Sequence, residues 1–213
     1  MIQEVQIDSL NASAEYGNIQ GGVFNIVTKQ GSNRFEFDAA YYAQSDRLTS
    51  HPEKLACVRC SEAETEYTRA RYRDFTTHLG GPILRDRLWF FGGYQYLRDY
   101  DSQPGTDPRF PRTDEFDKIF GKLTWQITSR LKLLTSFHDE FWVSPDRPTL
   151  ARPFETTLRT SGSRPTVTFG HLTHVLSSST LWEARLSRFV APQTSAPSTG
   201  DRTIPSRFDQ ATG

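Results

Sequence analysis

Polar and apolar residues alternate along many segments of this chain, a pattern that predicts β-strands with two different faces. The clearest segment is residues 34–44, where Phe35, Phe37, Ala39 and Tyr41 share one face and the opposite face begins with two carboxylates. An alternation over about ten residues has the length that a tilted strand needs to cross a membrane. The pattern therefore favours strands that separate lipid from water.

Eight other segments predict strands, and from residue 34 on their connections are alternately long and short. This alternation is typical of an antiparallel up-and-down meander, and outer-membrane barrels combine short turns at one end with long loops at the other. The other predicted strands are residues 4–8, 23–28, 71–79, 88–98, 115–126, 131–142, 165–176 and 180–191. The long stretches are residues 45–70, 99–113 and 143–164, and the turns are residues 80–87, 127–130 and 177–179.

Composition supports this interpretation, and the charge balance points to no particular partner. Hydrophobic residues make up only 36% of the 213 residues, yet there are 15 Phe, 8 Tyr and 4 Trp, as expected for strands with one lipid-facing side. A soluble β-rich sandwich is the alternative. The 25 basic and 25 acidic residues balance, so the net charge gives no argument for nucleic acid or an anionic lipid surface. No segment approaches the ~20 apolar residues of a transmembrane helix.

A glycine-rich stretch at residues 16–33 precedes the meander. Gly17, Gly21, Gly22 and Gly31 flank a short predicted strand, and glycines beside a strand indicate a backbone that passes through a tight space. The stretch lacks the Gly-Lys-Ser/Thr of a phosphate loop and no helical pattern follows it. It predicts a junction between two parts of a larger protein.

The residues that could carry chemistry are scattered. His171 and His174 are three apart in a predicted strand, and Asp139 and Glu140 are adjacent, so the members of each pair face apart. The other histidines are isolated in the sequence: His51, His78 and His138. We therefore expect no catalytic site, no metal site and no cofactor, and an enzyme is the least favoured class.

Two sequence motifs are specific. The first is Ser13-Ala14-Glu15-Tyr16-Gly17, then Gly21-Gly22, then a strand that ends at Thr28-Lys29, then Gly31-Ser32-Asn33. The second is Leu79-Gly80-Gly81-Pro82-Ile83, followed by Asp86-Arg87-Leu88-Trp89-Phe90-Phe91-Gly92. Both motifs resemble the TonB-dependent outer-membrane receptors, most closely their Oar-like branch. The resemblance covers residues 3–100, and the rest of the meander is compatible with it.

This resemblance implies an all-β fold in the outer membrane, an incomplete portion of a transmembrane β-barrel with a short plug remnant. Residues 1–33 would be the end of the plug, residues 34–191 about seven barrel strands, and residues 192–213 a polar tail. Gly17, Gly21, Gly22, Thr28, Lys29, Gly31 and Asn33 would form the plug–barrel junction, and Gly80, Gly81 and Pro82 a periplasmic turn. No export signal is visible and both ends look cut, so we expect a piece of a longer exported protein.

The implied function is energised uptake of an unknown ligand captured by the long loops. The implied partners are a TonB-type energy-coupling protein and outer-membrane lipid, with no nucleic acid. A surface-binding or adhesion barrel without transport, and a soluble β-rich binding domain, are the alternatives.

Cys57 and Cys60 form a lone C-x-x-C in the first long loop, which suits a redox motif, half a zinc site or a disulfide. In an exported protein the oxidising compartment favours a small loop disulfide.

Overall fold

The computed structural model describes residues 2–9, 22–50, 67–102, 110–146, 148, 153–162 and 164–203. Within these residues it contains strands and two short 3-10 helices, η1 (Asp46–Leu48) and η3 (Phe154–Thr156). The strands are β1 (Ile2–Ser9), β2 (Gly22–Thr28), β3 (Glu36–Gln44), β4 (Thr68–Leu84), β5 (Leu88–Ser102), β6 (Arg112–Thr128), β7 (Leu131–Pro145), β8 (Leu158–Gly162), β9 (Thr166–Ser177), β10 (Thr180–Val190) and β11 (Gln193–Pro197). No helix among these residues is long and apolar enough to cross a membrane, a result that has no bearing on crossing by strands.

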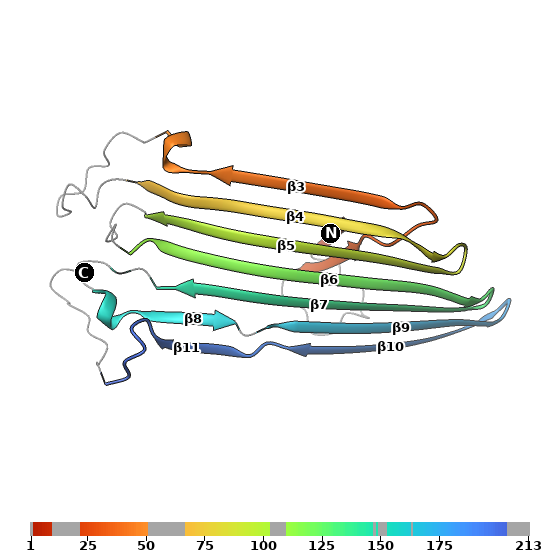
Figure 1. Cartoon of the computed structure of the whole chain (residues 1–213). Coiled ribbons are helices and arrows are strands. Elements are labelled where there is room, and N and C mark those ends of the chain that lie inside the picture. Colours follow the sequence, from red (N-terminus) through yellow and green to blue (C-terminus); the bar gives the residue numbers. More distant parts are fainter. Residues whose placement is uncertain are drawn as a thin grey trace.

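The strands form one large antiparallel meander and one separate hairpin (Figure 1). In the large sheet, neighbours along the chain are neighbours in space, in the order β10-β9-β7-β6-β5-β4-β3. Strands β8 and β9 pair with successive parts of β7, and β11 pairs with β8. β8 and β9 therefore form one path along β7, and β10 and β11 form the next path beside them. Counted in this way, the described part of the sheet has seven paths, and the sequence predicted about seven barrel strands.

The sheet is open within the described residues, because β3 and β10 are its two end strands. Its tight turns lie together at one end, on the right in Figure 1, and we call this the turn end and the opposite one the loop end. The turns are residues 85–87, 129–130 and 178–179. The predicted all-β antiparallel meander is thus confirmed, as an incomplete barrel sheet.

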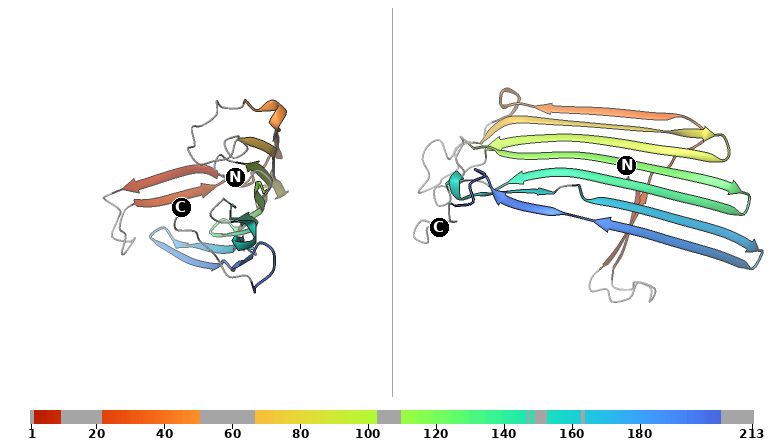
Figure 2. Two further views of the ribbon diagram at one scale, coloured as in Figure 1. Left: turned by 90° about the vertical axis from the view of Figure 1, so that its left-hand side faces the viewer. Right: turned by 60° about the horizontal axis from the view of Figure 1, so that its bottom comes forward.

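The hairpin of β1 and β2 projects from the concave side of the curved sheet (Figure 2). We call this side the inner face and the opposite side the outer face. Lys122 belongs to the inner face, because its ammonium group contacts the end of β2. The register places Phe91 of β5 and Ser136 of β7 beside Lys122, on the same face.

The outer face is apolar and uncovered. Neighbouring positions across the sheet include Phe37 opposite Leu79 and Gly121 opposite Phe137. Phe37 is 72% exposed and Leu186 is 79% exposed. Only three hydrophobic residues in the described part are buried, namely Phe91, Phe120 and Val143. Since burial of apolar area contributes about 25 cal/mol per Å², such a face suits a lipid environment rather than water.

Several predictions about element limits are wrong, and strand β8 lies inside the predicted loop of residues 143–164. Gly80, Gly81 and Pro82 are not a turn: they lie inside β4, and the turn comprises residues 85–87. Pro82 still pairs with Trp89, and a register shift follows between Pro82 and Leu84, as expected where a residue cannot donate a ladder hydrogen bond. The predicted polar tail also contains β11, which pairs with β8.

Candidate functional site at the junction of hairpin and sheet

The end of β2 is held to the sheet by a lysine. Lys122 of β6 donates hydrogen bonds from its Nζ atom to the main-chain oxygen of Thr28, at 3.0 Å, and to Thr28 Oγ1, at 3.1 Å. Lys122 is buried on the inner face, where an ammonium group without partners would be costly. The lysine therefore favours a hairpin that stays against the sheet.

The chain then passes close to the backbone of β4 and β5 at Gly31. A Cβ atom at Gly31 would lie 2.1 Å from the carbonyl oxygen of Phe90 and 3.0 Å from that of Gly81. A Cβ at Gly80 would lie 3.7 Å from the Cα of Gly31 and 3.1 Å from the ring of Phe91. Only glycine at position 31 permits this approach, and the tight space expected from the sequence lies here.

Asn33 fixes the passage to the turn between β4 and β5. Its Nδ2 donates to Asp86 Oδ1 at 2.5 Å, while its Oδ1 accepts from the Asp86 main-chain N–H at 2.9 Å. The indole Nε1 of Trp89 also donates to Asn33 Oδ1, at 2.7 Å. Asp86 has a φ of 62°, a left-handed conformation that aspartate tolerates better than most residues. One amide side chain thus satisfies three polar groups 53 to 56 residues away.

Phe35 completes the crossing from the hairpin to β3. A Cβ at Gly81 would lie 2.4 Å from the Phe35 ring, so the ring occupies the space that a side chain at position 81 would fill. The rings of Phe35 and Phe90 lie 6.4 Å apart and are tilted by 58°. Gly80 and Gly81 therefore accommodate Gly31 on one face of β4 and Phe35 on the other.

The structure brings together part of the predicted junction set. Thr28, Gly31 and Asn33 all contact the sheet, and Lys29 lies between them with an exposed side chain. Gly22 begins β2. Gly17 and Gly21 lie outside the described residues, as do His51, Cys57 and Cys60 of the first long loop.

Sequence reasoning missed the sheet residues that receive the junction: Lys122, Asp86 and Trp89. Asp86 and Trp89 belong to the second motif of the resemblance, which hinted that the two motifs meet. Lys122 had no signal beyond its place on the polar face of a predicted strand. Pairing residues 94 positions apart requires the fold.

A second polar cluster lies at the loop end of the inner face. The guanidinium of Arg112 contacts Asp99 at 3.1 Å, Asp101 at 2.8 Å and Asp114 at 3.2 Å. Arg69 also pairs with Asp99, and the Asp101 side chain is only 2% exposed. These cross-strand ion pairs join β4, β5 and β6 beyond the apolar band.

Tyr67, just before β4, packs beside this cluster. The Arg69 guanidinium lies 5.6 Å from the centre of its ring. Partial burial is the main factor that raises the pKa of the Tyr67 phenol, and the nearby Arg69 acts in the opposite direction. The phenol therefore remains neutral at physiological pH.

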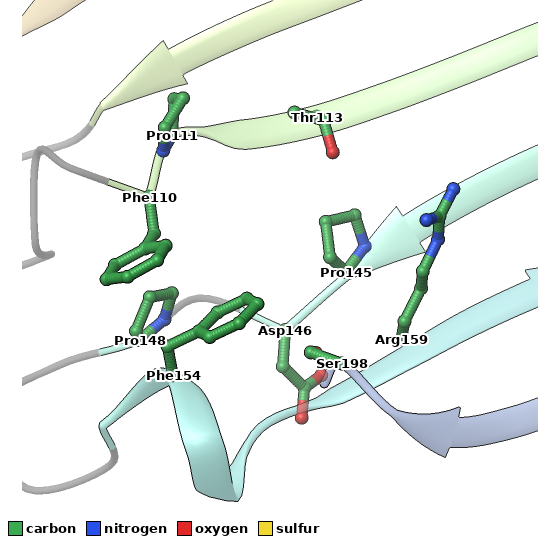
Figure 3. A pocket seen from close by; sticks show the side chains of 9 residues that line it. All are labelled: Phe110, Pro111, Thr113, Pro145, Asp146, Pro148, Phe154, Arg159 and Ser198. Atoms are coloured by element: carbon green, nitrogen blue, oxygen red, sulfur yellow. The ribbon is translucent and has the colours of Figure 1, made fainter. Parts of the chain in front are cut away.

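A cavity of about 260 Å³ opens at the same end of the sheet (Figure 3). Phe110 and Phe154 stack at one side, with ring centres 4.5 Å apart and planes 4° from parallel. Three prolines and two charged side chains contribute to its wall. The lining residues are Phe110, Pro111, Thr113, Pro145, Asp146, Pro148, Phe154, Arg159 and Ser198. Arg159 and Asp146 give this apolar cavity a charged rim.

The described histidines are each near a carboxylate or a ring. His78 stacks on Phe91, with ring centres 5.9 Å apart. His138 lies 3.5 Å from Glu140, and His171 lies 3.2 Å from Glu183. His174 is opposite Trp182 in the register. No group of three or more metal-ligating side chains comes together within the described ranges.

Comparison with known proteins agrees with this architecture. Residues 27–116 match the family described as outer membrane beta barrel domain, a range that contains the passage from Thr28 to Phe35 and the sheet strands β3, β4 and β5. The chain is also 35% identical over 94 residues to the TonB-dependent transporter Oar of Myxococcus xanthus. That match covers 44% of this chain and 9% of the relative. No solved structure gives a significant match.

These matches indicate the outer membrane as the location. The matched domain is a membrane barrel and the matched relative is a transporter, so neither points to an enzyme. Together with the open meander and its apolar outer face, they support a relation between the covered part of the chain and the TonB-dependent outer-membrane receptors.

Proposed function

We propose that this chain forms the end of the plug and the first barrel strands of a TonB-dependent receptor that takes up a ligand. In this proposal residues 1–33 belong to the plug, and the barrel wall begins at residue 34. The observation that carries it is the passage from Thr28 to Asn33, which leads from a separate hairpin on the inner face into the first sheet strand. The similarity to an Oar transporter supports the same assignment.

The two attachments of the hairpin suit different tasks. Lys122 holds Thr28 through one flexible side chain, which can release its partner and return to it. Asn33 and Gly31 hold the passage through three hydrogen bonds and a close backbone approach. We infer that the passage is the fixed anchor and that the hairpin moves relative to it when a TonB-type protein acts on the plug.

Ligand capture falls to the loop end in this proposal. The strands that flank the long stretches at residues 45–70, 99–113 and 143–164 end there, and described residues of two of these stretches line the Phe110–Phe154 cavity. A ligand held there would reach the lumen only if the plug rearranged. Energised uptake therefore requires the hairpin to leave its place beside Lys122.

A cleavable cross-link between hairpin and wall tests this. Thr28→Cys and Lys122→Cys would be joined by a disulfide-containing bis-maleimide, in a background with Cys57→Ser and Cys60→Ser. A direct disulfide is unsuitable because a lysine-length side chain separates the two backbones. The readout is depletion of medium compounds by the native host, compared with a gene deletion and a deletion of the energy-coupling protein. The single-cysteine variants, treated with the same reagent, are the matched controls.

We expect at least one compound that the wild-type strain removes from the medium and that remains in the medium of both deletion strains. The cross-linked variant should also leave it, and reduction of the linker should restore its consumption. Consumption that continues without the coupling protein, or in the cross-linked variant, would contradict uptake through plug movement. It would favour a barrel that only binds its ligand at the surface.

A further inference from the structure

Three arginines gather on the outer face of the sheet near the loop end. Arg71 and Arg73 lie two positions apart on β4, so their side chains share one face, and both are exposed. Arg73 is directly opposite Arg98 of β5, and Arg71 is opposite Tyr100. This arginine cluster (Arg71, Arg73 and Arg98) lies on the face opposite to Lys122.

The charges of the cluster are unevenly compensated. Arg98 contacts Asp117 at 2.6 Å and Glu115 at 3.9 Å. Arg71 has a ring contact, 5.4 Å from the centre of Tyr100, and no carboxylate partner among the described residues. Arg73 has neither kind of partner there. Arg98 also donates to the main-chain oxygens of Leu97 and Phe116, so its own charge is compensated. Arg71 and Arg73 are the exposed cations of the cluster, and an external anion would compensate their charges.

The same face becomes apolar toward the turn end. On β4, Phe75 and Leu79 follow Arg73 on this face, and beyond the register shift Leu84 lies there too, opposite Leu88 of β5. On β3, Tyr41 and Phe37 lie opposite Phe75 and Leu79. Leu79 and Leu84 are 45% and 56% exposed. The cationic groups and the apolar band follow each other along the sheet as the anionic headgroup and the acyl chains follow each other in a lipid.

We propose that Arg71 and Arg73 of the arginine cluster bind the phosphate of a phosphorylated glycolipid in the outer leaflet, with acyl chains along β3 and β4. The proposal rests on the proposed function, because it requires the loop end to lie outside the cell. Guanidinium groups donate two parallel hydrogen bonds to phosphate oxygens. The neighbouring Tyr100 and Tyr96 rings suit the membrane–water interface, where tyrosine is enriched.

Binding of lipid A to the protein, purified in neutral detergent as its host produces it, tests the site. Two probes would be compared by native mass spectrometry: lipid A with both phosphates and the same lipid with both removed. The test variant is Arg71→Gln with Arg73→Gln. Arg130→Gln is the matched control, because Arg130 is an exposed arginine in the turn at the other end of the sheet. Each arginine should contribute about fivefold in affinity, the factor for ~1 kcal/mol at a membrane surface.

We expect the unmodified protein and the Arg130→Gln variant to prefer the phosphorylated lipid. The double variant should lose about 25-fold of that preference. Equal binding of the two lipids by the unmodified protein would overturn the proposal without any variant, and so would a preference that survives in the double variant. Displacement by inorganic pyrophosphate at the lipid's own concentration would indicate a free-anion site and would also overturn it.

Two further measurements keep the test interpretable. If the double variant does not fold, Arg73→Lys replaces it. This variant retains the charge, so it should keep most of the preference for the phosphorylated lipid, and loss of that preference would contradict binding through charge. Heat-modifiable gel migration reports the barrel separately. If the barrel is intact but shows no preference for the phosphorylated lipid, only the lipid site is overturned. If the unmodified protein shows no heat-modifiable migration, the proposed function is contradicted.

Discussion

Replacing Asn33 should release the passage from the turn between β4 and β5. Asn33→Ala removes two acceptor contacts and one donor contact, to the Asp86 main-chain N–H, the Trp89 indole and the Asp86 carboxylate. A hydrogen bond contributes a net ~0.5–1.5 kcal/mol, and more with a charged partner. Because all three are solvent-exposed and water replaces them in part, we expect a loss of about 2 kcal/mol, or ~30-fold in the local closing equilibrium.

The Asp86 amide is the direct probe of this loss. Its N–H is bonded to Asn33 Oδ1, so hydrogen–deuterium exchange of the peptide over residues 84–89 should accelerate by up to ~30-fold in Asn33→Ala. Ser32→Ala is the matched control, because Ser32 Oγ bonds only to the neighbouring Arg34 backbone. Its exchange in residues 84–89 should equal that of the wild type.

A swap of the two side chains separates hydrogen bonding from size. Asn33→Asp keeps the acceptor but places a second carboxylate beside Asp86, so exchange should accelerate as in Asn33→Ala. Adding Asp86→Asn restores a donor–acceptor pair, and asparagine also tolerates the left-handed backbone of that position. Exchange within twofold of the wild type in Asn33→Ala, or no recovery in the swapped pair, would refute the assignment.

Three further changes have clear expected outcomes. Gly31→Ala places a Cβ 2.1 Å from a β5 carbonyl oxygen and should prevent the heat-modifiable form, whereas Gly121→Ala, which meets nothing within 4 Å, should leave it intact. Lys122→Met should speed proteolysis of residues 22–28 without changing the melting of the barrel; equal protection in both proteins would argue against the contact. Arg112→Met leaves the nearly buried Asp101 without its closest cation and should cost ~3 kcal/mol, seen as a lower temperature at which heat-modifiable migration is lost; adding Asp101→Leu should recover much of this loss.

The alternation of residues predicted the faces of the sheet well. In residues 34–44 the apolar members lie on the outer face, with Phe37 opposite Leu79 and Tyr41 opposite Phe75. The lipid environment imposes this alternation, because each strand must present an apolar side chain at every second position. The turns were equally accessible where polar residues interrupted the alternation, as at residues 129–130 and 178–179.

The ends of the strands were predicted less well, for an electrostatic reason. Beyond the apolar band the strands remain paired, and cross-strand ion pairs such as Arg98–Asp117 and Arg112–Asp101 join them there. A run of charged residues resembles a loop when each strand is considered alone. β5 therefore ends only at Ser102, and β6 already begins at Arg112, so both strands extend into the segment of residues 99–113 that was predicted as a loop. The junction shows the same limit, because Asn33 and Asp86 are 53 residues apart.

The arginine cluster explains why a zero net charge was a poor guide to the surface of this chain. The balance of 25 basic and 25 acidic residues counts side chains without regard to the face on which they lie. The register places Arg98 within reach of Asp117, but it places Arg73 between Ala43 and Arg98. Charges that cancel in the sum are thus separated by the sheet, and a local anion-binding surface arises in a chain that is neutral overall.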